Sequence, residues 1–254
     1  MVDRLSSKGR RVFLSGWEVG FLAFFLIISL SACGTTSVSI RCSGVNVTCR
    51  SGKSPVLSPN ATAQAQAVAT MEAIKRDKPL LSDPLSSQDR NDWGNNSVCS
   101  FHDGAYFLTV NNFSGTESCD SASFGGHFGD VAIQVNVTLY SENSAAGLLF
   151  RATADLNEYY TFLINDGQFF LGFFGKNNTE TDVIPYTSNS VVHGLGKTNT
   201  LLVIAQGDDF RLFINGKFVA EGYDSTLTNG FVGVALSHVS SAKARFSNLI
   251  VYPA

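Results

Sequence analysis

From about residue 80 to the C-terminus, apolar and polar residues alternate in short runs that are separated by turn sequences. The run from Val131 to Leu139 carries an apolar residue at every second position, which predicts a long strand with one buried face. Further runs meet at Asp166-Gly167 and at Asn215-Gly216, and these dipeptides accept the positive φ angles of type I′ hairpin turns. Because no helical pattern lies between the runs, we predict an antiparallel β-sandwich of about 160 residues, built as one domain.

One short helix is predicted ahead of the sandwich. Asn60 can cap an alanine-rich stretch from Ala61 to Lys78, which a proline then ends. Within it, Val68, Met71 and Ile74 recur at three-residue intervals, the spacing of one helical face. Since this apolar stripe is thin, we expect a stalk that packs loosely on the domain in preference to a helix that binds a partner.

The N-terminal segment has the layout of a secretory signal. Four cationic residues lie at its start, Arg4, Lys8, Arg10 and Arg11. An apolar run of about 12 residues follows, from Val19 to Leu30, which is shorter than a membrane span usually needs. It ends in Leu30-Ser31-Ala32-Cys33, which resembles the lipobox of bacterial lipoproteins. The resemblance implies cleavage before Cys33 and attachment of a lipid to its thiol.

An uncleaved anchor helix is the alternative, since Glu18 is the only charged residue between Val12 and Ala32. Either arrangement tethers the chain to a bacterial cell membrane, facing the extracellular or periplasmic side. We therefore divide the chain into a signal peptide at 1–32, a Ser/Thr-rich spacer at 33–79 that contains the helix 61–78, and a sandwich domain at 80–254.

Cysteine usage agrees with export. Apart from Cys33, the chain has an even set of four, Cys42, Cys49, Cys99 and Cys119. Four cysteines allow three connectivities, and an oxidising compartment favours pairing them. The local pairs, Cys42 with Cys49 and Cys99 with Cys119, are the simplest choice.

Charge and motif content argue against several partners and cofactors. The 18 Lys and Arg against 21 Asp and Glu give a formal net charge of -3, without the basic excess that binds nucleic acid. No Gly-rich loop joins a strand to a helix as nucleotide binding requires, and the cysteine spacings do not suit zinc. We predict no cofactor and no metal, and leave calcium open because aspartates lie near the predicted strand ends without forming a dense ligand run.

Several strand sequences resemble the concanavalin A-like lectin/glucanase superfamily, especially its laminin G-like bacterial members, over roughly residues 84–252. They are Gly147-Leu148-Leu149-Phe150-Arg151, the run Tyr159 to Ile164, Asp166-Gly167-Gln168-Phe169, Leu212-Phe213-Ile214-Asn215-Gly216, Gly230 to Val234, and Phe246 to Val251. The resemblance implies an all-β fold, an antiparallel jelly-roll β-sandwich. It also implies a domain that binds glycans or proteins, sometimes with calcium, and that hydrolyses glycosidic bonds in some branches; these motifs identify the fold better than the activity.

Catalytic carboxylates are not evident. The glucanase branch relies on closely spaced carboxylates such as Glu-x-Asp-x-x-Glu on one strand, because a retaining mechanism needs two of them about 5 Å apart. The nearest acidic groups that we identify here are Asp155 with Glu158 and the adjacent Asp208-Asp209, all in predicted turns. Aspartate in a turn usually makes local hydrogen bonds, so we expect these residues to be structural.

Strand parity suggests one binding surface. If Phe150 and Tyr160 point into the sandwich, then Arg151, Tyr159 and Phe170 point to the other face, as does Phe174. Aromatic rings stack on the apolar faces of sugars, and an arginine can bond hydroxyls or a carboxylate. We therefore take Arg151, Tyr159, Phe170 and Phe174 as candidate ligand-binding residues on the concave face. The alternative is that another layer or a loop covers them.

Two functions of different classes follow from these features. The first is a non-catalytic, lipid-anchored surface module whose partner, besides the membrane, is a glycan, a cell-wall component or a surface protein. The second is an atypical extracellular enzyme that acts on glycosides, which a pair of acidic side chains converging on the aromatic face would favour. A third alternative is a structural envelope lipoprotein that has no soluble ligand.

Overall fold

The computed structural model describes residues 39–42, 45–48, 61–88, 91–111, 114–120, 128–176 and 179–254. The chain forms two compact units, residues 1–54 and 55–254. In the first unit, β1 (Ser39–Cys42) and β2 (Val45–Thr48) pair as an antiparallel hairpin in which Cys42 lies opposite Val45. The predicted signal peptide, the lipidated Cys33 and the predicted Cys42–Cys49 disulfide lie outside the described residues.

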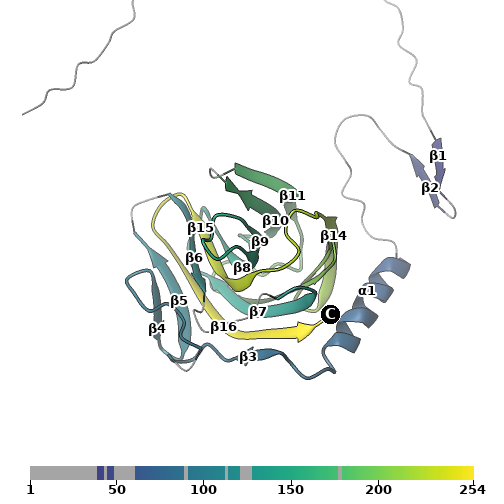
Figure 1. Ribbon diagram of the computed structural model, residues 1–254. Coiled ribbons are helices and arrows are strands. Elements are labelled where there is room, and N and C mark those ends of the chain that lie inside the picture. The colour runs from purple at the N-terminus through teal and green to yellow at the C-terminus, as the bar shows by residue number, and fades with distance from the viewer. Residues whose placement is uncertain are drawn as a thin grey trace, which may run out of the picture. The chain divides into compact units, whose positions relative to one another are not determined.

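The second unit is a sandwich of two antiparallel sheets, as the alternating pattern predicts. The six-stranded sheet has the order β11-β10-β9-β8-β15-β6, and its strands are β6 (Gly115–Asp120), β8 (Ser144–Ala152), β9 (Tyr159–Ile164), β10 (Gln168–Gly175), β11 (Thr179–Ser188) and β15 (Phe231–His238). Figure 1 shows the larger sheet curved around this one.

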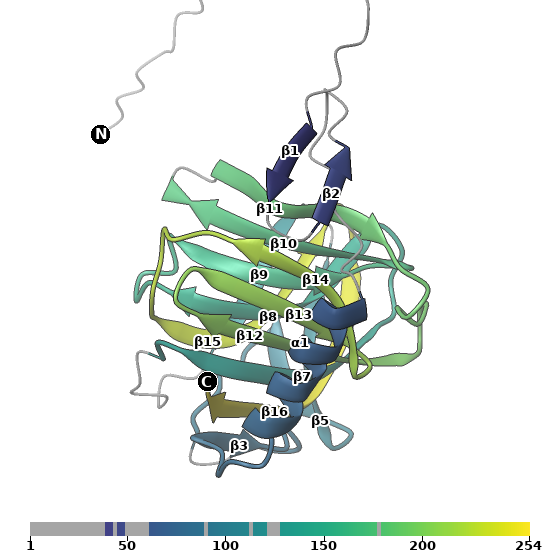
Figure 2. The ribbon, with the colours of Figure 1, turned by 90° about the vertical axis from the view of Figure 1, so that its right-hand side faces the viewer.

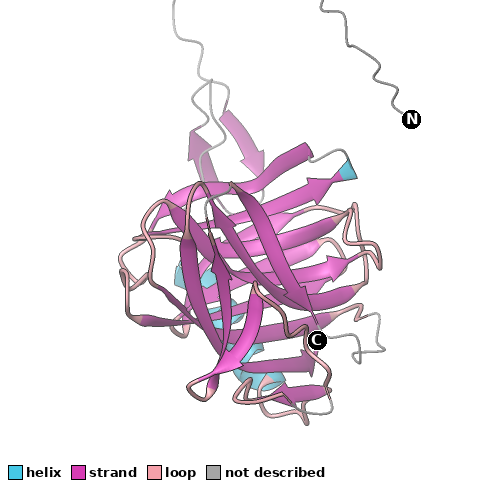
Figure 3. Cartoon of the chain, turned by 90° about the vertical axis from the view of Figure 1, so that its left-hand side faces the viewer, coloured by secondary structure: helices cyan, strands magenta, loops and turns pink. Residues whose placement is uncertain are grey.

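The eight-stranded sheet has the order β14-β13-β12-β7-β16-β5-β4, with β3 paired to β16. Its strands are β3 (Leu81–Asp83), β4 (Cys99–His102), β5 (Ala105–Val110), β7 (Val131–Leu139), β12 (Thr198–Gln206), β13 (Asp209–Ile214), β14 (Lys217–Tyr223) and β16 (Ala242–Pro253). Alternate apolar residues of both sheets fill the space between them, as the period of two requires. Figure 3, seen from the left of Figure 1, shows that strands make up most of this unit, with the helix visible behind them.

Two hairpins form where the turn dipeptides predict them, with different turn geometry. Between β13 and β14, Asn215 (φ 52°) and Gly216 (φ 75°) are both left-handed, as a type I′ turn requires. Between β9 and β10, only Gly167 (φ 88°) is left-handed, so the predicted type I′ turn is wrong there. The side chain of Asn165 explains the difference, because its Oδ1 accepts the Gln168 N–H at 3.1 Å and closes the turn from the side chain.

The predicted helix forms as α1 (Ala61–Ile74), four residues shorter at its end than the alanine-rich stretch. Met71 and Ile74 of the predicted stripe are buried together with Ala67, while Val68 is partly buried. They pack on the outer face of the eight-stranded sheet, against a cluster that includes Ala132, Leu202, Ile204, Phe213 and Tyr252. Figure 2 shows the helix lying across β7, β12 and β13. Within the described part of the chain, no helix has the length and hydropathy to span a membrane.

The predicted disulfide between Cys99 and Cys119 is present, with the two Cα atoms 6.2 Å apart. Cys99 begins β4, at one edge of the eight-stranded sheet, and Cys119 lies in β6, at one edge of the six-stranded sheet. The bond therefore joins the two sheets along one side of the sandwich. The sequence separation of 20 residues did not indicate that the bond would link different sheets.

Candidate functional site

The outer face of the six-stranded sheet carries a small apolar cluster of its own. Its buried members are Ala145, Leu149, Ala152, Leu163, Phe170 and Ala235, and Leu156, Tyr159, Phe174 and Phe231 are partly buried against them. The opposite parity, which includes Phe150, Tyr160 and Phe162, lies in the core between the sheets. The parity prediction for β9 and β10 is therefore confirmed.

Aromatic side chains are stacked in two pairs on this outer face. Tyr159 and Phe174 are cross-strand neighbours whose rings stack at 5.2 Å with an interplanar angle of 16°. Phe170 stacks on Tyr186 of β11 at 4.7 Å, also at 16°. The Phe170 ring lies over Gly172, where a Cβ atom would come within 2.3 Å of it. A glycine at 172 thus lets the ring lie flat and leaves Tyr186 as the exposed layer of the stack.

Arg151 does not lie on the outer face, so its predicted place beside Tyr159 and Phe170 is wrong. Phe150 and Arg151 together lie opposite a single residue of β15, because the register shifts between Phe231 and Gly233. Such a β-bulge interrupts the alternation of side chains, and Arg151 takes a left-handed φ of 48°. Its guanidinium carbon consequently lies 5.2 Å from the centre of the Phe210 ring, on the core side.

The buried Arg151 links loops of the two sheets at one end of the sandwich. Its side chain is 1% exposed, and Nη1 donates to the carbonyl oxygens of Gly207 at 2.8 Å and Leu227 at 2.9 Å. Asp130 lies 3.6 Å from Nη2 and is half exposed. Burial lowers the pKa of Arg151, while Tyr160 and Asp130 raise it. These contacts make Arg151 a structural residue.

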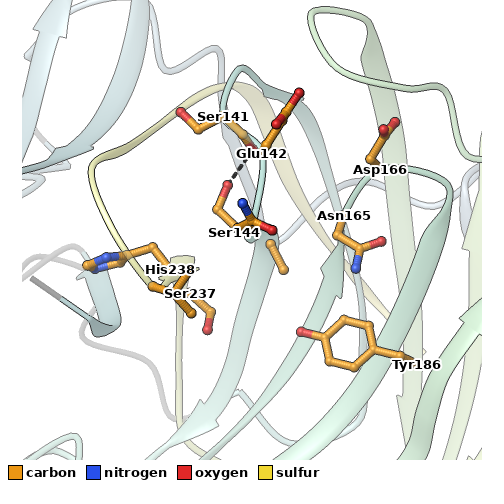
Figure 4. A pocket seen from close by; sticks show the side chains of 11 residues that line it. Ser141, Glu142, Ser144, Asn165, Asp166, Tyr186, Ser237 and His238 are labelled. Atoms are coloured by element: carbon orange, nitrogen blue, oxygen red, sulfur yellow. Dashed lines mark hydrogen bonds between the residues drawn. The ribbon is translucent and has the colours of Figure 1, made fainter.

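A cleft of about 440 Å³ opens at one end of the outer face. It is lined by Ser141, Glu142, Asn143, Ser144, Ala145, Asn165, Asp166, Tyr186, Ser237, His238 and Val239. These residues come from the β7–β8 turn, the start of β8, the β9–β10 turn, β11, and the end of β15 with the residue that follows it. Figure 4 shows the labelled polar side chains surrounding the cleft, with the hydroxyl of Tyr186 directed into it.

The cleft combines an exposed aromatic ring with polar groups. Tyr186 is 45% exposed and Val239 is 67% exposed, and both belong to the few large apolar side chains that the described surface exposes. Burial, Glu180 and Asp182 raise the pKa of the Tyr186 phenol, in that order. The phenol therefore keeps its proton at neutral pH and can both donate and accept a hydrogen bond.

Two carboxylates of β11 lie beside the aromatic pairs. Glu180 is opposite Phe174 and Asp182 is opposite Gly172, so both share the outer face. Burial, followed by repulsion from Asp182, raises the pKa of Glu180. The pKa of the Tyr159 phenol is also raised, first by burial and then by the negative charges of Glu180 and Glu117. Acidic side chains thus approach the aromatic face from the edge strand.

The acidic residues that we expected to be structural make local contacts, although Asp209 begins β13 and does not lie in the predicted turn. Asp155 accepts hydrogen bonds from Thr153 Oγ1 at 2.6 Å and Asn157 Nδ2 at 2.7 Å, and these bonds lower its pKa to about 2. Asp209 pairs with Arg211, which also contacts Glu221 at 3.1 Å. Among the described residues, no group of three or more His, Cys, Asp or Glu side chains is arranged to hold a metal ion.

Sequence reasoning missed Tyr186 and the cleft. The strand that carries Tyr186, Thr179–Ser188, is mostly exposed and contains a proline, so it lacks the apolar alternation that identified the other strands. The turns that line the cleft are separated by as many as about 100 residues in the sequence, and only the sheet order brings them together. The sequence feature that could have indicated this site is Pro185-Tyr186, a large aromatic residue that follows a proline within a polar run.

Comparison with known proteins gives a likeness of fold alone. No model of a protein family matches the sequence, and no curated protein does. The carbohydrate-binding module CBM66 from Bacillus subtilis superposes with a TM-score of 0.54 and 17% identity, covering 65% of this chain and 99% of that one.

Two further solved structures are similar to the same extent. A Bacillus licheniformis beta-glucanase gives a TM-score of 0.51 at 13% identity, covering 68% of this chain and 97% of its own. A Bacillus subtilis protein of unknown function with a galectin-like fold gives 0.53 at 15% identity, covering 69% and 96%. The chain therefore has the jelly-roll sandwich fold of concanavalin A-like and galectin-like proteins.

Proposed function

We propose that the protein is a non-catalytic binding module that holds a glycan in the cleft beside Tyr186. The observation that carries this proposal is the Tyr186 ring, 45% exposed and stacked on the buried Phe170 at the edge of a polar cleft. A ring held in place from behind loses little conformational freedom when a ligand stacks on its free side. Similar folds in a carbohydrate-binding module and in glucanases support the choice of ligand class.

The chemistry of the cleft suits a sugar. A pyranose presents apolar C–H groups on its faces, which stack on an aromatic ring, and hydroxyls around its rim, which need donors and acceptors. Asn143, Asp166 and Ser237 line the cleft around the ring and offer such groups. Tyr159 and Phe174 extend the aromatic surface toward the other end of the same sheet face, so a longer chain would have a second stacking position.

Substitution of Tyr186 tests this proposal. In the full chain, Tyr186→Ala should weaken binding to the glycan that an array or polysaccharide pull-down identifies by about tenfold, since a central aromatic contact contributes more than about 1 kcal/mol. Tyr223→Ala is the matched control, because Tyr223 is 64% exposed on β14 of the other sheet. Equal binding by both variants would refute the assignment, and a wild-type chain that binds no glycan would favour the structural envelope lipoprotein.

We further propose that the module is displayed on a membrane through a lipid on Cys33. The Leu30-Ser31-Ala32-Cys33 sequence after a basic and apolar lead supports this. Cys33→Ala should abolish incorporation of labelled fatty acid and leave an unprocessed precursor, whereas Cys42→Ala should leave both unchanged. Labelling that persists in Cys33→Ala would exclude the anchor.

One observation favours hydrolysis as a second candidate function. Glu180 has a raised pKa and shares the aromatic face with Asp182, and a retaining mechanism uses one carboxyl group as the acid and a second as the nucleophile. If hydrolysis occurs, the full chain should release reducing ends from a bound glycan and Glu180→Gln should stop that release without weakening binding. Binding without any release of reducing ends would leave the module non-catalytic.

A further inference from the structure

Charged side chains are distributed unequally over the two sheets. The strands of the six-stranded sheet contain four acidic residues and one basic residue: Glu117, Asp120, Glu180, Asp182 and Arg151. The strands of the eight-stranded sheet contain three acidic and four basic residues: Asp83, Asp209, Glu221, Arg211, Lys217, Lys243 and Arg245. By register, Asp120, Glu180 and Asp182 lie on the outer face, whereas Glu117 lies opposite the core residue Leu236. Since Arg151 is buried on the core side, the strands of the six-stranded sheet present these three carboxylates and no exposed lysine or arginine on the outer face.

The cleft continues this acidic character. Glu142 and Asp166 are both exposed, and they come from the β7–β8 and β9–β10 turns respectively. Figure 4 shows their carboxylates along one rim, with the Tyr186 ring across the cleft from them. Within the described residues no ion pair involves Glu142 or Asp166, and no Lys or Arg lines the cleft. The nearby Lys243 is directed elsewhere, with Nζ 4.5 Å from the centre of the Phe107 ring.

We propose that the cleft selects glycans that carry free amino groups, in which a hexosamine ring stacks on Tyr186 and its ammonium group lies between Glu142 and Asp166. This inference rests on the proposed glycan-binding function and names the class of sugar. An ammonium group has three N–H donors and a positive charge, so it complements two carboxylate acceptors that lack a cationic partner. Uronic acids and other anionic sugars would be repelled by the same carboxylates.

A divalent cation fits the cleft less well than an ammonium group does. Calcium takes six to eight oxygen ligands, and magnesium needs an octahedral set. Only Glu142 and Asp166 supply carboxylates to the cleft, and they lie on separate turns. An organic cation, in contrast, needs only a few acceptors and gains the rest of its binding energy from stacking on the ring.

Two hexasaccharides with the same backbone test the inference: the hexamer of glucosamine, in which every amine is free, and the hexamer of N-acetylglucosamine. We expect the full chain to bind the glucosamine hexamer about tenfold more tightly at pH 6 and low salt. The preference should decrease when the pH rises and the amines lose their protons, and when the salt concentration rises. Equal or stronger binding of the acetylated hexamer would overturn the inference.

Two pairs of substitutions distinguish an effect of the cleft carboxylates from an effect of the net charge of the chain. Glu142→Gln with Asp166→Asn should abolish the preference for free amines. Glu72→Gln with Asp77→Asn changes the net charge equally at exposed positions in α1 and just after it, and should preserve the preference. If both pairs of substitutions lower the preference for free amines equally, the charge effect is non-specific and the inference fails.

A peptide of six lysines and a neutral β-glucan hexamer complete the experiment. Displacement of the glucosamine hexamer by hexalysine at equal concentration, with no effect of Tyr186→Ala, would show a cation site for peptides and overturn the inference. Binding of the neutral hexamer that depends on Tyr186, with no binding of glucosamine, would overturn the amine preference and leave the glycan-binding function standing. If no oligosaccharide binds, both proposals fail.

Discussion

Replacing the buried Arg151 should destabilise the sandwich strongly. Its Nη1 bonds two carbonyl oxygens, of Gly207 and Leu227, and its guanidinium packs on the Phe210 ring. A hydrogen bond from a charged donor contributes about 1.5–3 kcal/mol, and the stacking contact adds up to about 1 kcal/mol. The cost of burying the guanidinium offsets part of this sum, and the half-exposed Asp130 can be rehydrated when the arginine is lost.

The net effect that we expect for Arg151→Ala is a loss of about 3 kcal/mol in the free energy of unfolding. For a unit of this size, the melting temperature should fall by about 6–12 °C. Arg151→Met fills much of the volume without donating hydrogen bonds, so its loss should be about 2 kcal/mol. Urea unfolding followed by tryptophan fluorescence measures these differences, and Arg245→Ala, on a partly exposed residue of β16, is the control.

A third substitution distinguishes the contribution of the Arg151 side chain to stability from the cost of its backbone conformation. Arg151 has a left-handed φ of 48°, which costs a residue with a Cβ atom about 1 kcal/mol and costs glycine nothing comparable. Arg151→Gly should therefore be more stable than Arg151→Ala by about 1 kcal/mol, although it removes the same hydrogen bonds. A loss below about 1 kcal/mol for Arg151→Ala, or a glycine variant less stable than the alanine variant, would refute the structural role assigned to this residue.

Three further results are expected. Cys99→Ser, which opens the disulfide to Cys119, should lower the free energy of unfolding by about 3 kcal/mol, and a wild-type chain unaffected by reducing agent would contradict this. Met71→Ala should cost about 2 kcal/mol in the same urea assay, because α1 buries this side chain on the sheet; a cost near zero would mean a loosely attached helix. Burial and then Glu221 raise the pKa of Asp209 to about 6. Between pH 3.8 and about 6 the folded state therefore binds more protons than the unfolded state, and the free energy of unfolding falls as the pH rises through this range. Asp209→Asn should flatten this dependence, and an unchanged slope would contradict the assignment.

Much of the fold was predictable because it depends on short-range patterns. The alternation in Val131 to Leu139 predicted a strand with one apolar face, and β7 forms there, although both of its faces are largely buried. The Asn215-Gly216 turn depends on the φ angles of two adjacent residues. The helix from Ala61 was predictable for the same reason, since its apolar period is local. Pairing Cys99 with Cys119 needed only the count of cysteines and a preference for short loops.

Other features were decided by contacts between distant segments. The bulge at Phe150 and Arg151 depends on how β8 pairs with β15, about 80 residues later, and it moved Arg151 from the expected outer face to the core side. A one-residue bulge moves a side chain to the opposite face of the sheet, and the sequence of β8 alone does not indicate the bulge.

The cleft shows the same limit for function. The sequence by itself determined which strand faces carry aromatic side chains, because facing follows from the period of two along each strand. Only the sheet order could place Tyr186 over Phe170 and bring Glu142, Asp166 and His238 around it, because these residues belong to turns and strands that meet through long-range pairing. Local sequence therefore determined the elements with a regular apolar period, but not the polar strand β11, and tertiary pairing decided which side chains form a site.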